Sequence, residues 1–182
     1  MAEVVAEVEH GPMATVDIRP LTDADVEAIP PAFAALGWPG KSIEQYRRYL
    51  REQAAGERLV LVALADGVFA GYVTVHWVSG YPPFREGGFP EIQDFNVLPD
   101  FRRRGIGTAL MDAAEKAAAQ RSDTVGVGVG LYADYGSAQR MYARRGYIPD
   151  GRGVNYRGVA QPPGTTVRLD DDLILMMTRR LG

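Results

Sequence analysis

Residues 95–108 read Phe-Asn-Val-Leu-Pro-Asp-Phe-Arg-Arg-Arg-Gly-Ile-Gly-Thr, and this stretch decides the fold. The alternating pattern that leads into it predicts a strand over Glu91–Val97. Pro99 ends this strand, because proline cannot donate a hydrogen bond to a neighbouring strand. The following residues are rich in Ala, Leu and Met and predict a helix over Arg104–Arg121. The stretch is therefore a turn between a strand and the start of a helix.

Three consecutive arginines, Arg102 to Arg104, stand at the start of that helix. A helix N-terminus carries a partial positive charge and exposed N–H groups, which repel arginine side chains. The placement makes sense if a phosphate or pyrophosphate fills the site, with Gly105 and Gly107 letting the backbone come close. The alternative is a solvated arginine run that precedes a helix by chance. Two other phosphate motifs do not fit: there is no P-loop run, and Leu110 replaces the third glycine of a dinucleotide fingerprint.

A second pattern lies on a short helix predicted over Ser137–Arg145, which Gly146 ends. It reads Ala138-x-x-x-Tyr142-x-x-x-Gly146-Tyr147. Apolar side chains at helical spacing place Tyr142 on the stripe that faces the protein core, so we expect it to be partly buried.

Together the two patterns resemble the GCN5-related N-acetyltransferases, the GNAT family. Arg102-x-x-Gly105-x-Gly107, preceded by Val97-x-Pro99, is similar to that family's acyl-CoA pyrophosphate loop, Gln/Arg-x-x-Gly-x-Gly/Ala. The tyrosine pattern is similar to its Ala-x-x-x-Tyr-x-x-x-Gly-Phe/Tyr segment. The resemblance runs roughly from Ala14 to Arg180. It implies the acyl-CoA N-acyltransferase fold: α/β (α+β type), with one mixed, mostly antiparallel sheet flanked by helices in a single domain.

The resemblance also implies acetyl-CoA as the co-substrate and assigns roles to residues. The sheet of the family splays open beside the strand that ends at Val97, and the backbone there binds the pantetheine arm. The N–H groups of the arginine–glycine loop bind the pyrophosphate, and Tyr142 donates a proton to the leaving CoA thiolate. The alternative for Tyr142 is a core aromatic residue. The implied cofactor-binding residues are Phe95, Asn96, Val97, Arg102, Arg103, Arg104, Gly105, Ile106, Gly107 and Thr108.

The chain departs from the family pattern at two positions. Tyr135 stands where the family often has an asparagine that contacts the cofactor, and Gly130 stands where some members have a glutamate base. The base must therefore come from elsewhere, or water must relay the proton. The candidate bases are Glu91 and Asp94, which period-2 alternation places on opposite faces of their strand unless a bulge intervenes. The alternative for each is a carboxylate on the surface of the strand. His76, with an ordinary pKa of about 6.5, is an alternative base or a packed structural histidine.

The rest of the chain alternates strands and helices, with no repeats and no internal domain boundary. Asp66-Gly67 between two apolar runs predicts a hairpin. We assign residues 1–13 to a flexible N-terminal tail and 14–182 to the acetyltransferase domain. The further predicted strands are Ala14–Arg19, Arg58–Ala65, Val68–Val78, Thr124–Tyr132, Tyr147-Ile148 and Leu173–Thr178. The further helices run from Thr22 or Asp23 to Pro30-Pro31 and from Ser42 to Ala55, and the long loops are Ser79–Pro90 and Gly151–Thr166.

Composition excludes several classes of protein. Of the 182 residues, 46% are hydrophobic and 24% charged, which is typical of a globular domain, and the net charge of −3 argues against nucleic acid as a partner. Cysteine is absent, which excludes a disulfide framework and a thiolate nucleophile, and with two histidines we expect no metal site. No apolar run is long enough to span a membrane. We expect a cytoplasmic protein.

The acceptor should lie opposite the CoA arm, between the first two helices and the Ser79–Pro90 loop. Aromatic residues in these segments, such as Phe33, Trp38 and Tyr46, suit an amine with some apolar bulk. A small-molecule or peptide amine is expected, and protein N-termini, polyamines, amino acids and antibiotics all stay open, as does a homodimer. The leading hypothesis is direct attack of the amine on the thioester; the alternative is a non-catalytic acyl-CoA sensor on the same fold.

Overall fold

In the computed structural model, which describes residues 15–38 and 40–182, Asp66 and Gly67 turn the chain between two strands as predicted. Both residues have positive φ angles, 49° and 80°, which is the conformation of a two-residue hairpin turn. The flanking strands are β2 (Arg58–Ala65) and β3 (Val68–His76), and they pair antiparallel from the turn outward. The predicted tail, residues 1–13, lies outside the described residues.

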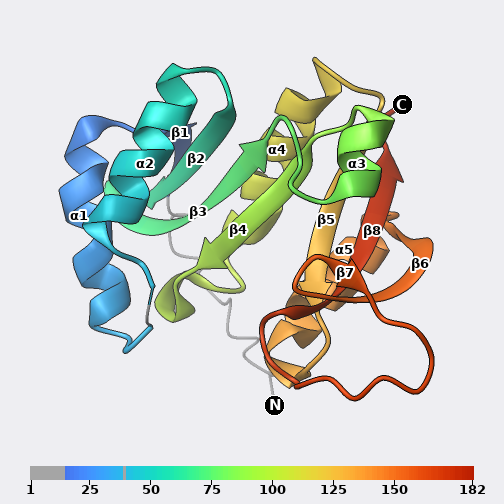
Figure 1. Ribbon diagram of the computed structural model, residues 1–182. Helices are drawn as coiled ribbons and strands as arrows, with labels where there is room; N and C mark the ends of the chain where they lie inside the picture. The colour runs from blue at the N-terminus through green and yellow to red at the C-terminus, as the bar shows by residue number, and fades with distance from the viewer. Residues whose placement is uncertain (1–14, 39) are drawn as a thin grey trace, which may run out of the picture.

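Eight strands form one mixed sheet in the order β1-β2-β3-β4-β5-β8-β6-β7 (Figure 1). Each neighbouring pair in this described sheet is antiparallel except β4 and β5, which are parallel. The mixed, mostly antiparallel sheet flanked by helices is thereby confirmed. Besides β2 and β3, the strands are β1 (Val16–Pro20), β4 (Glu91–Val97), β5 (Thr124–Gly130), β6 (Ile148–Tyr156), β7 (Val159–Ala160) and β8 (Leu173–Arg180).

Helices cover both faces of the sheet. In Figure 1, α1 (Asp23–Ala34), α2 (Ile43–Ala54) and α3 (Pro82–Gly87) lie in front of the sheet. Behind it lie α4 (Ile106–Ala119) and α5 (Gly136–Arg144). The face that carries α1, α2 and α3 is called the front face below.

Each face of the sheet has its own apolar core, because successive side chains along a strand point to opposite faces. On the front, Phe33 of α1 and Tyr46 of α2 pack against Tyr72 of β3, and all three are fully buried. On the back, α4 buries the helical stripe that includes Leu110 and Met111 against β3, β4 and β5. Full burial of a large apolar side chain stabilises the fold by roughly 1.5–3 kcal/mol, so these two cores hold the helices onto the sheet.

Three sequence predictions need correction. α1 continues through Pro30 and Pro31 to Ala34, because the buried side chains on either side, Ile29 and Phe33, keep its last turn on the sheet. The predicted loop Ser79–Pro90 contains α3, which begins with two prolines at positions where a helix needs no N–H donor.

The third correction concerns the predicted loop Gly151–Thr166, because β6 runs into it. The strand pairs with β8 on both sides of an irregular stretch between Pro149 and Val154. Gly151 and Gly153 allow this stretch, since both have positive φ angles, 81° and 77°. The glycines that indicated a loop therefore mark a bulge within a strand.

The sheet divides between β4 and β5. These strands pair only at Glu91 with Gly126 and at Ile92 with Val127. Beyond Ile92, β4 stays with β3 and β5 stays with β8, so the two strands diverge (Figure 1). The result is a fork with two facing backbone edges, which we call the β4–β5 fork.

Candidate functional site

The arginine–glycine loop presents backbone N–H groups at the start of α4. Arg103 and Gly105 both have left-handed φ angles, 58° and 78°, and Gly105 is the N-cap of α4. In the described part of the chain, no backbone acceptor is bonded to the N–H groups of residues 103–108. A turn of this kind, followed by a helix N-terminus, concentrates N–H donors and favours an anion.

The two glycines of this loop serve different purposes. A Cβ atom on Gly105 would meet nothing within 4 Å, so only the left-handed backbone conformation favours glycine at this position. A Cβ atom on Gly107 would lie 3.2 Å from the Phe95 ring. Gly107 therefore lets α4 pack closely on β4.

The three arginines of the loop are exposed, and within the described residues none is ion-paired with an acid. Arg102 donates from Nε to the carbonyl of Val97, 3.1 Å away, and its guanidinium lies 5.7 Å from the Trp38 ring centre. Arg102 thus fastens the end of β4 to the loop. The positive charge of the three side chains is available to a bound anion.

A bulge in β4, the exception that the alternation argument left open, places Glu91 and Asp94 on the same side of the sheet. Tyr72 of β3 is opposite Asn96 and Thr74 is opposite Gln93, so β4 has one extra residue between these pairs. Asp94 absorbs it with a φ of 48°. As a result Asp94 contacts α2 on the front face, where Glu91 also lies, while Phe95 packs into the core behind the sheet.

Asp94 is held by five donors. Gln45, Tyr49 and Asn96 each donate to it over 2.9 Å, and Tyr72 and Lys41 complete the set. Burial would raise the pKa of the carboxyl, but the Lys41 ammonium and the hydroxyl donors outweigh burial and hold the pKa below its usual range. A carboxylate that is this strongly stabilised in its ionised form is a poor proton acceptor.

Glu91 has the opposite character. It lies where the β4–β5 fork opens, is 7% exposed, and accepts a hydrogen bond from the Ser79 hydroxyl. Burial raises the pKa of its carboxyl, against smaller lowering effects of Ser79, Gln93 and Arg58. A carboxyl group with a raised pKa at the opening of a cleft suits a general base.

His76 lies beside Glu91 in the same row of the sheet. Glu91 is opposite His76, and His76 is opposite Arg58 of β2, so the three side chains share the front face. Burial and the Arg58 charge lower the pKa of His76.

Tyr142 projects from α5 into the core behind the sheet. It is 4% exposed, and its ring centre lies 5.6 Å from that of Tyr147. Burial raises its pKa, so the hydroxyl stays protonated at neutral pH. In the portion of the chain that the structure describes, this hydroxyl donates to no other group. The predicted burial is confirmed.

A buried ionic cluster holds α5 in place. Glu115 of α4 accepts hydrogen bonds from Arg145, Arg179 and Tyr147, which are the C-cap of α5, a residue of β8 and the residue before β6. These donors hold the pKa of the Glu115 carboxyl below its usual range although burial opposes them. The cluster is a structural anchor beneath Tyr142.

Three glycines alternate along β5 on the front face. A Cβ atom on Gly126 would lie 2.0 Å from the Phe84 ring, and one on Gly130 would lie 2.4 Å from the Tyr135 ring. Between them, a Cβ atom on Gly128 would contact only the flexible side chains of Met176 and Ile174, at 3.2 and 3.4 Å. Phe84 and Tyr135 therefore approach the β5 backbone closely at these two glycines. Tyr135 also occupies the space that a glutamate at position 130 would need.

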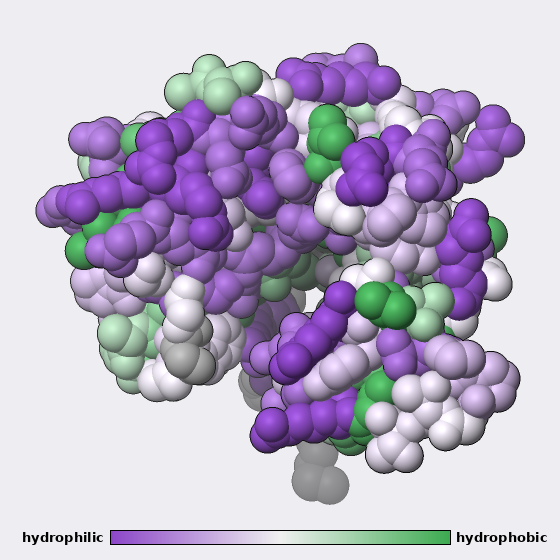
Figure 2. Space-filling view, viewed as in Figure 1, coloured by the Kyte–Doolittle hydropathy of each residue, from purple (hydrophilic) through white to green (hydrophobic). Residues whose placement is uncertain are grey.

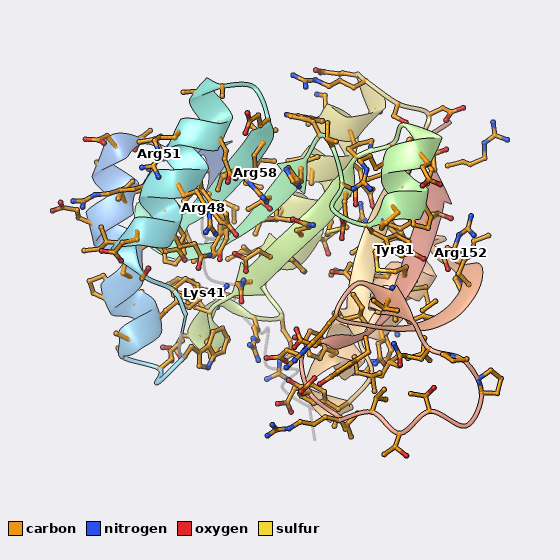
Figure 3. The ribbon with its side chains drawn as sticks, viewed as in Figure 1. Lys41, Arg48, Arg51, Arg58, Tyr81 and Arg152 are labelled. Atoms are coloured by element: carbon orange, nitrogen blue, oxygen red, sulfur yellow. The ribbon has the colours of Figure 1, made fainter. Side chains whose placement is uncertain are left out.

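The front face opens into a cleft between the half that carries α1 and α2 and the half that carries β6 and β7 (Figure 2). Figure 3 places Lys41, Arg48 and Arg58 on the α2 side, with Tyr81 and Arg152 on the other side. Tyr81 donates to Asp150 of β6 over 2.8 Å, and burial together with this bond raises its pKa to about 12.

The aromatic residues expected to line the acceptor site mostly do not reach it. Phe33, Tyr46 and Phe84 are fully buried in the core, whereas Trp38 and Tyr81 keep partial exposure. Sequence reasoning also missed Lys41, Tyr72 and Ser79. They are brought to Asp94 and Glu91 only by folding, and no local motif marks them.

Two features are absent from the described residues. No group of three or more His, Asp or Glu side chains there could hold a metal ion. Within the same residues, no helix is both long enough and apolar enough to cross a membrane.

Comparison with known proteins places the fold. The family described as "Acetyltransferase (GNAT) family" matches residues 25–147, more than half of the chain. No curated protein matches the sequence. Many solved structures share the fold, and three of them, each with a TM-score of 0.62 or more, illustrate its range.

The first of these structures is yncA of Salmonella typhimurium, solved with acetyl-CoA: 20% identity, TM-score 0.63, 92% of this chain and 94% of that one covered. The second is a ribosomal-protein-alanine N-acetyltransferase of Brucella melitensis, with 21% identity and a TM-score of 0.64. The match covers 90% of this chain and 98% of that one. The third is the spermidine/spermine N-acetyltransferase SpeG of Vibrio cholerae, with 14% identity and a TM-score of 0.62. The match covers 91% of this chain and 92% of that one.

Proposed function

This chain belongs to the acetyltransferase (GNAT) family, and from that premise we propose that it acetylates the amine of a small molecule or peptide by direct attack on acetyl-CoA. Family membership makes it an N-acetyltransferase with acetyl-CoA as co-substrate. The observation that carries the proposal is the β4–β5 fork together with the unbonded N–H groups of residues 103–108.

The residues of the fork and the loop fit acetyl-CoA. A pyrophosphate needs N–H donors and positive charge, which the loop around Gly105 and the three exposed arginines offer. A pantetheine arm carries amide groups that need backbone partners. The β4 edge beyond Ile92 offers them, because β5 has left it. We therefore assign these two parts of the molecule to the loop and to the β4 edge.

The reaction requires two proton transfers. The amine nitrogen forms a C–N bond to the acetyl carbon as the C–S bond breaks, so the amine loses a proton and the CoA thiolate gains one. We assign the first proton to Glu91, because it lies at the fork and burial raises the pKa of its carboxyl. Direct attack is further supported by the absence of cysteine, which leaves no thiolate to carry the acetyl group.

We assign the second proton to Tyr142. Its hydroxyl is protonated at neutral pH because burial raises its pKa. It belongs to the same core cluster as Ile92, the β4 residue at the fork. This arrangement supports a general acid that reaches the fork from behind the sheet.

Asp94 receives a positioning role in this proposal, although the sequence named it as a possible base. Its five donors join β3, β4, α2 and the segment before α2. By holding the bulge, it fixes the face to which Glu91 and Asn96 point.

The acceptors named for the compared structures are chemically diverse. The names of the compared structures span a ribosomal-protein alanine and the polyamines spermidine and spermine. On the α2 side of the cleft, the cations Lys41 and Arg58 are paired with the half-buried acids Asp94 and Glu52. We therefore propose an amine without restricting its class further.

The test is a thiol-release assay with acetyl-CoA across a panel of polyamines, amino acids and peptides with free N-termini. We expect saturable release of CoA with one class of amine, together with the acetylated product by mass spectrometry. Tight CoA binding by calorimetry without turnover on any amine would instead favour the acyl-CoA sensor.

A further inference from the structure

Ser79 contacts the proposed base directly. Its hydroxyl donates to Oε2 of Glu91, and the side chain is 1% exposed. The backbone N–H of Tyr81 donates to the same hydroxyl oxygen over 2.9 Å. Ser79 therefore connects the segment before α3 to the carboxylate at the fork.

The direction of the Ser79 hydroxyl is fixed by these two partners. A backbone N–H can only donate, so Ser79 Oγ accepts from Tyr81 and its single proton points to Glu91. Ser79 thus engages one of the four lone-pair sites of the carboxylate, on Oε2, and both sites of Oε1 stay free of Ser79. We propose that Ser79 is a positioning residue for acetyl transfer, which presents Oε1 of Glu91 to the amine and keeps the carboxylate ionised. This inference rests on the assignment of Glu91 as the base.

The charged groups around Glu91 leave Ser79 as the closest hydrogen-bond donor to its carboxylate. Arg58 of β2 faces it but is paired with Glu52 of α2 over 2.6 Å, and His76 of β3 stands in the same row. From its own strand the neighbour is Gln93, and Gly126 of β5 carries no side chain. Ser79 is thus the closest donor to the carboxylate, and it opposes the burial that raises the pKa of Glu91.

The test is the pH profile of kcat/KM for Ser79→Ala, measured with the amine that gives CoA release in the parent enzyme. Loss of a hydrogen bond to a charged group should move the acid limb upward by about one pH unit. Activity should fall by about tenfold well below the limb and recover at high pH. Titration of the Glu91 carboxyl by carbon-13 NMR should show the same shift, which separates Glu91 from His76.

Ser122→Ala is the matched control. The Ser122 hydroxyl accepts from the backbone N–H two residues later, as that of Ser79 does, and lies outside the site. Ser122→Ala should leave the acid limb at the pH of the parent. Ser79→Thr, which retains a hydroxyl, should also give an acid limb at the pH of the parent. If Ser79→Ala does not fold, Ser79→Cys keeps the volume with a much weaker donor and carries the same prediction.

An acid limb and a Glu91 titration that stay unchanged in the folded Ser79 variant would overturn the inference. The proposed function fails in a different way: Glu91→Gln would then keep the parent profile, whatever Ser79 does.

Discussion

Replacement of Gly105 by valine tests the anion loop. Gly105 has a φ of 78°, a conformation that strains a β-branched residue by roughly 1–3 kcal/mol. The loop relieves this strain by rotating, which turns N–H groups away from the phosphates. Loss of two hydrogen bonds to a charged group costs about 3 kcal/mol, so the affinity for CoA should fall by about 100-fold.

The assay is isothermal titration calorimetry with CoA, and Gly56→Val is its matched control. Gly56 follows α2 and has a φ of 74°, and a Cβ atom there would also meet nothing within 4 Å. This control should lose a similar amount of stability and keep the parent affinity. If Gly105→Val folds and binds CoA as tightly as the parent, the phosphates do not lie at this loop and the reasoning fails.

Three other substitutions probe the remaining assignments. Tyr142→Phe keeps the ring, so kcat should fall by about 100-fold while KM for acetyl-CoA and the melting temperature stay nearly unchanged; turnover at the parent rate would leave Tyr142 a packing residue. Asp94→Asn leaves the Lys41 ammonium without its counter-ion, so stability should fall by about 3 kcal/mol with the acid limb in place, and a displaced limb would speak for Asp94 as the base. Glu115→Gln should cost about 2 kcal/mol in denaturant unfolding at pH 7. Because the pKa of Glu115 is lowered in the folded protein, its contribution to stability is present above the unfolded pKa and disappears as the pH falls through the folded pKa. If Glu115→Gln lost the same stability at low pH as at pH 7, the ionic cluster would be excluded as the source of this stability.

Local sequence patterns predicted the strand and helix to which we assign cofactor binding, and the hairpin of the same sheet. The hairpin at Asp66-Gly67, the strand Glu91–Val97 and the helix after Gly105 all depend on neighbouring residues, through turn chemistry, alternation and helix propensity. The unbonded N–H groups and unpaired arginines of the loop agree with an argument made from charge alone.

The acid–base chemistry depended on contacts that no local pattern records. The bulge at Asp94 arises because Lys41, Tyr49 and Tyr72, distant in the sequence, converge on its carboxylate. Simple alternation therefore placed Glu91 and Asp94 wrongly. The aromatic residues expected in the acceptor site are core residues for a similar reason, since two faces of the sheet need covering and an aromatic side chain does not reveal which side it packs on.

The pH dependence of acetyl transfer in Glu91→Gln decides whether Glu91 takes the proton from the amine. The parent should show an acid limb in kcat/KM set by Glu91, whose carboxyl pKa is raised by burial. The variant should retain CoA affinity, lose about 100-fold or more of its activity at neutral pH, and recover only as the amine itself deprotonates at high pH. A variant that keeps the acid limb and the rate of the parent would show that another group takes the proton from the amine and that Glu91 is not the base.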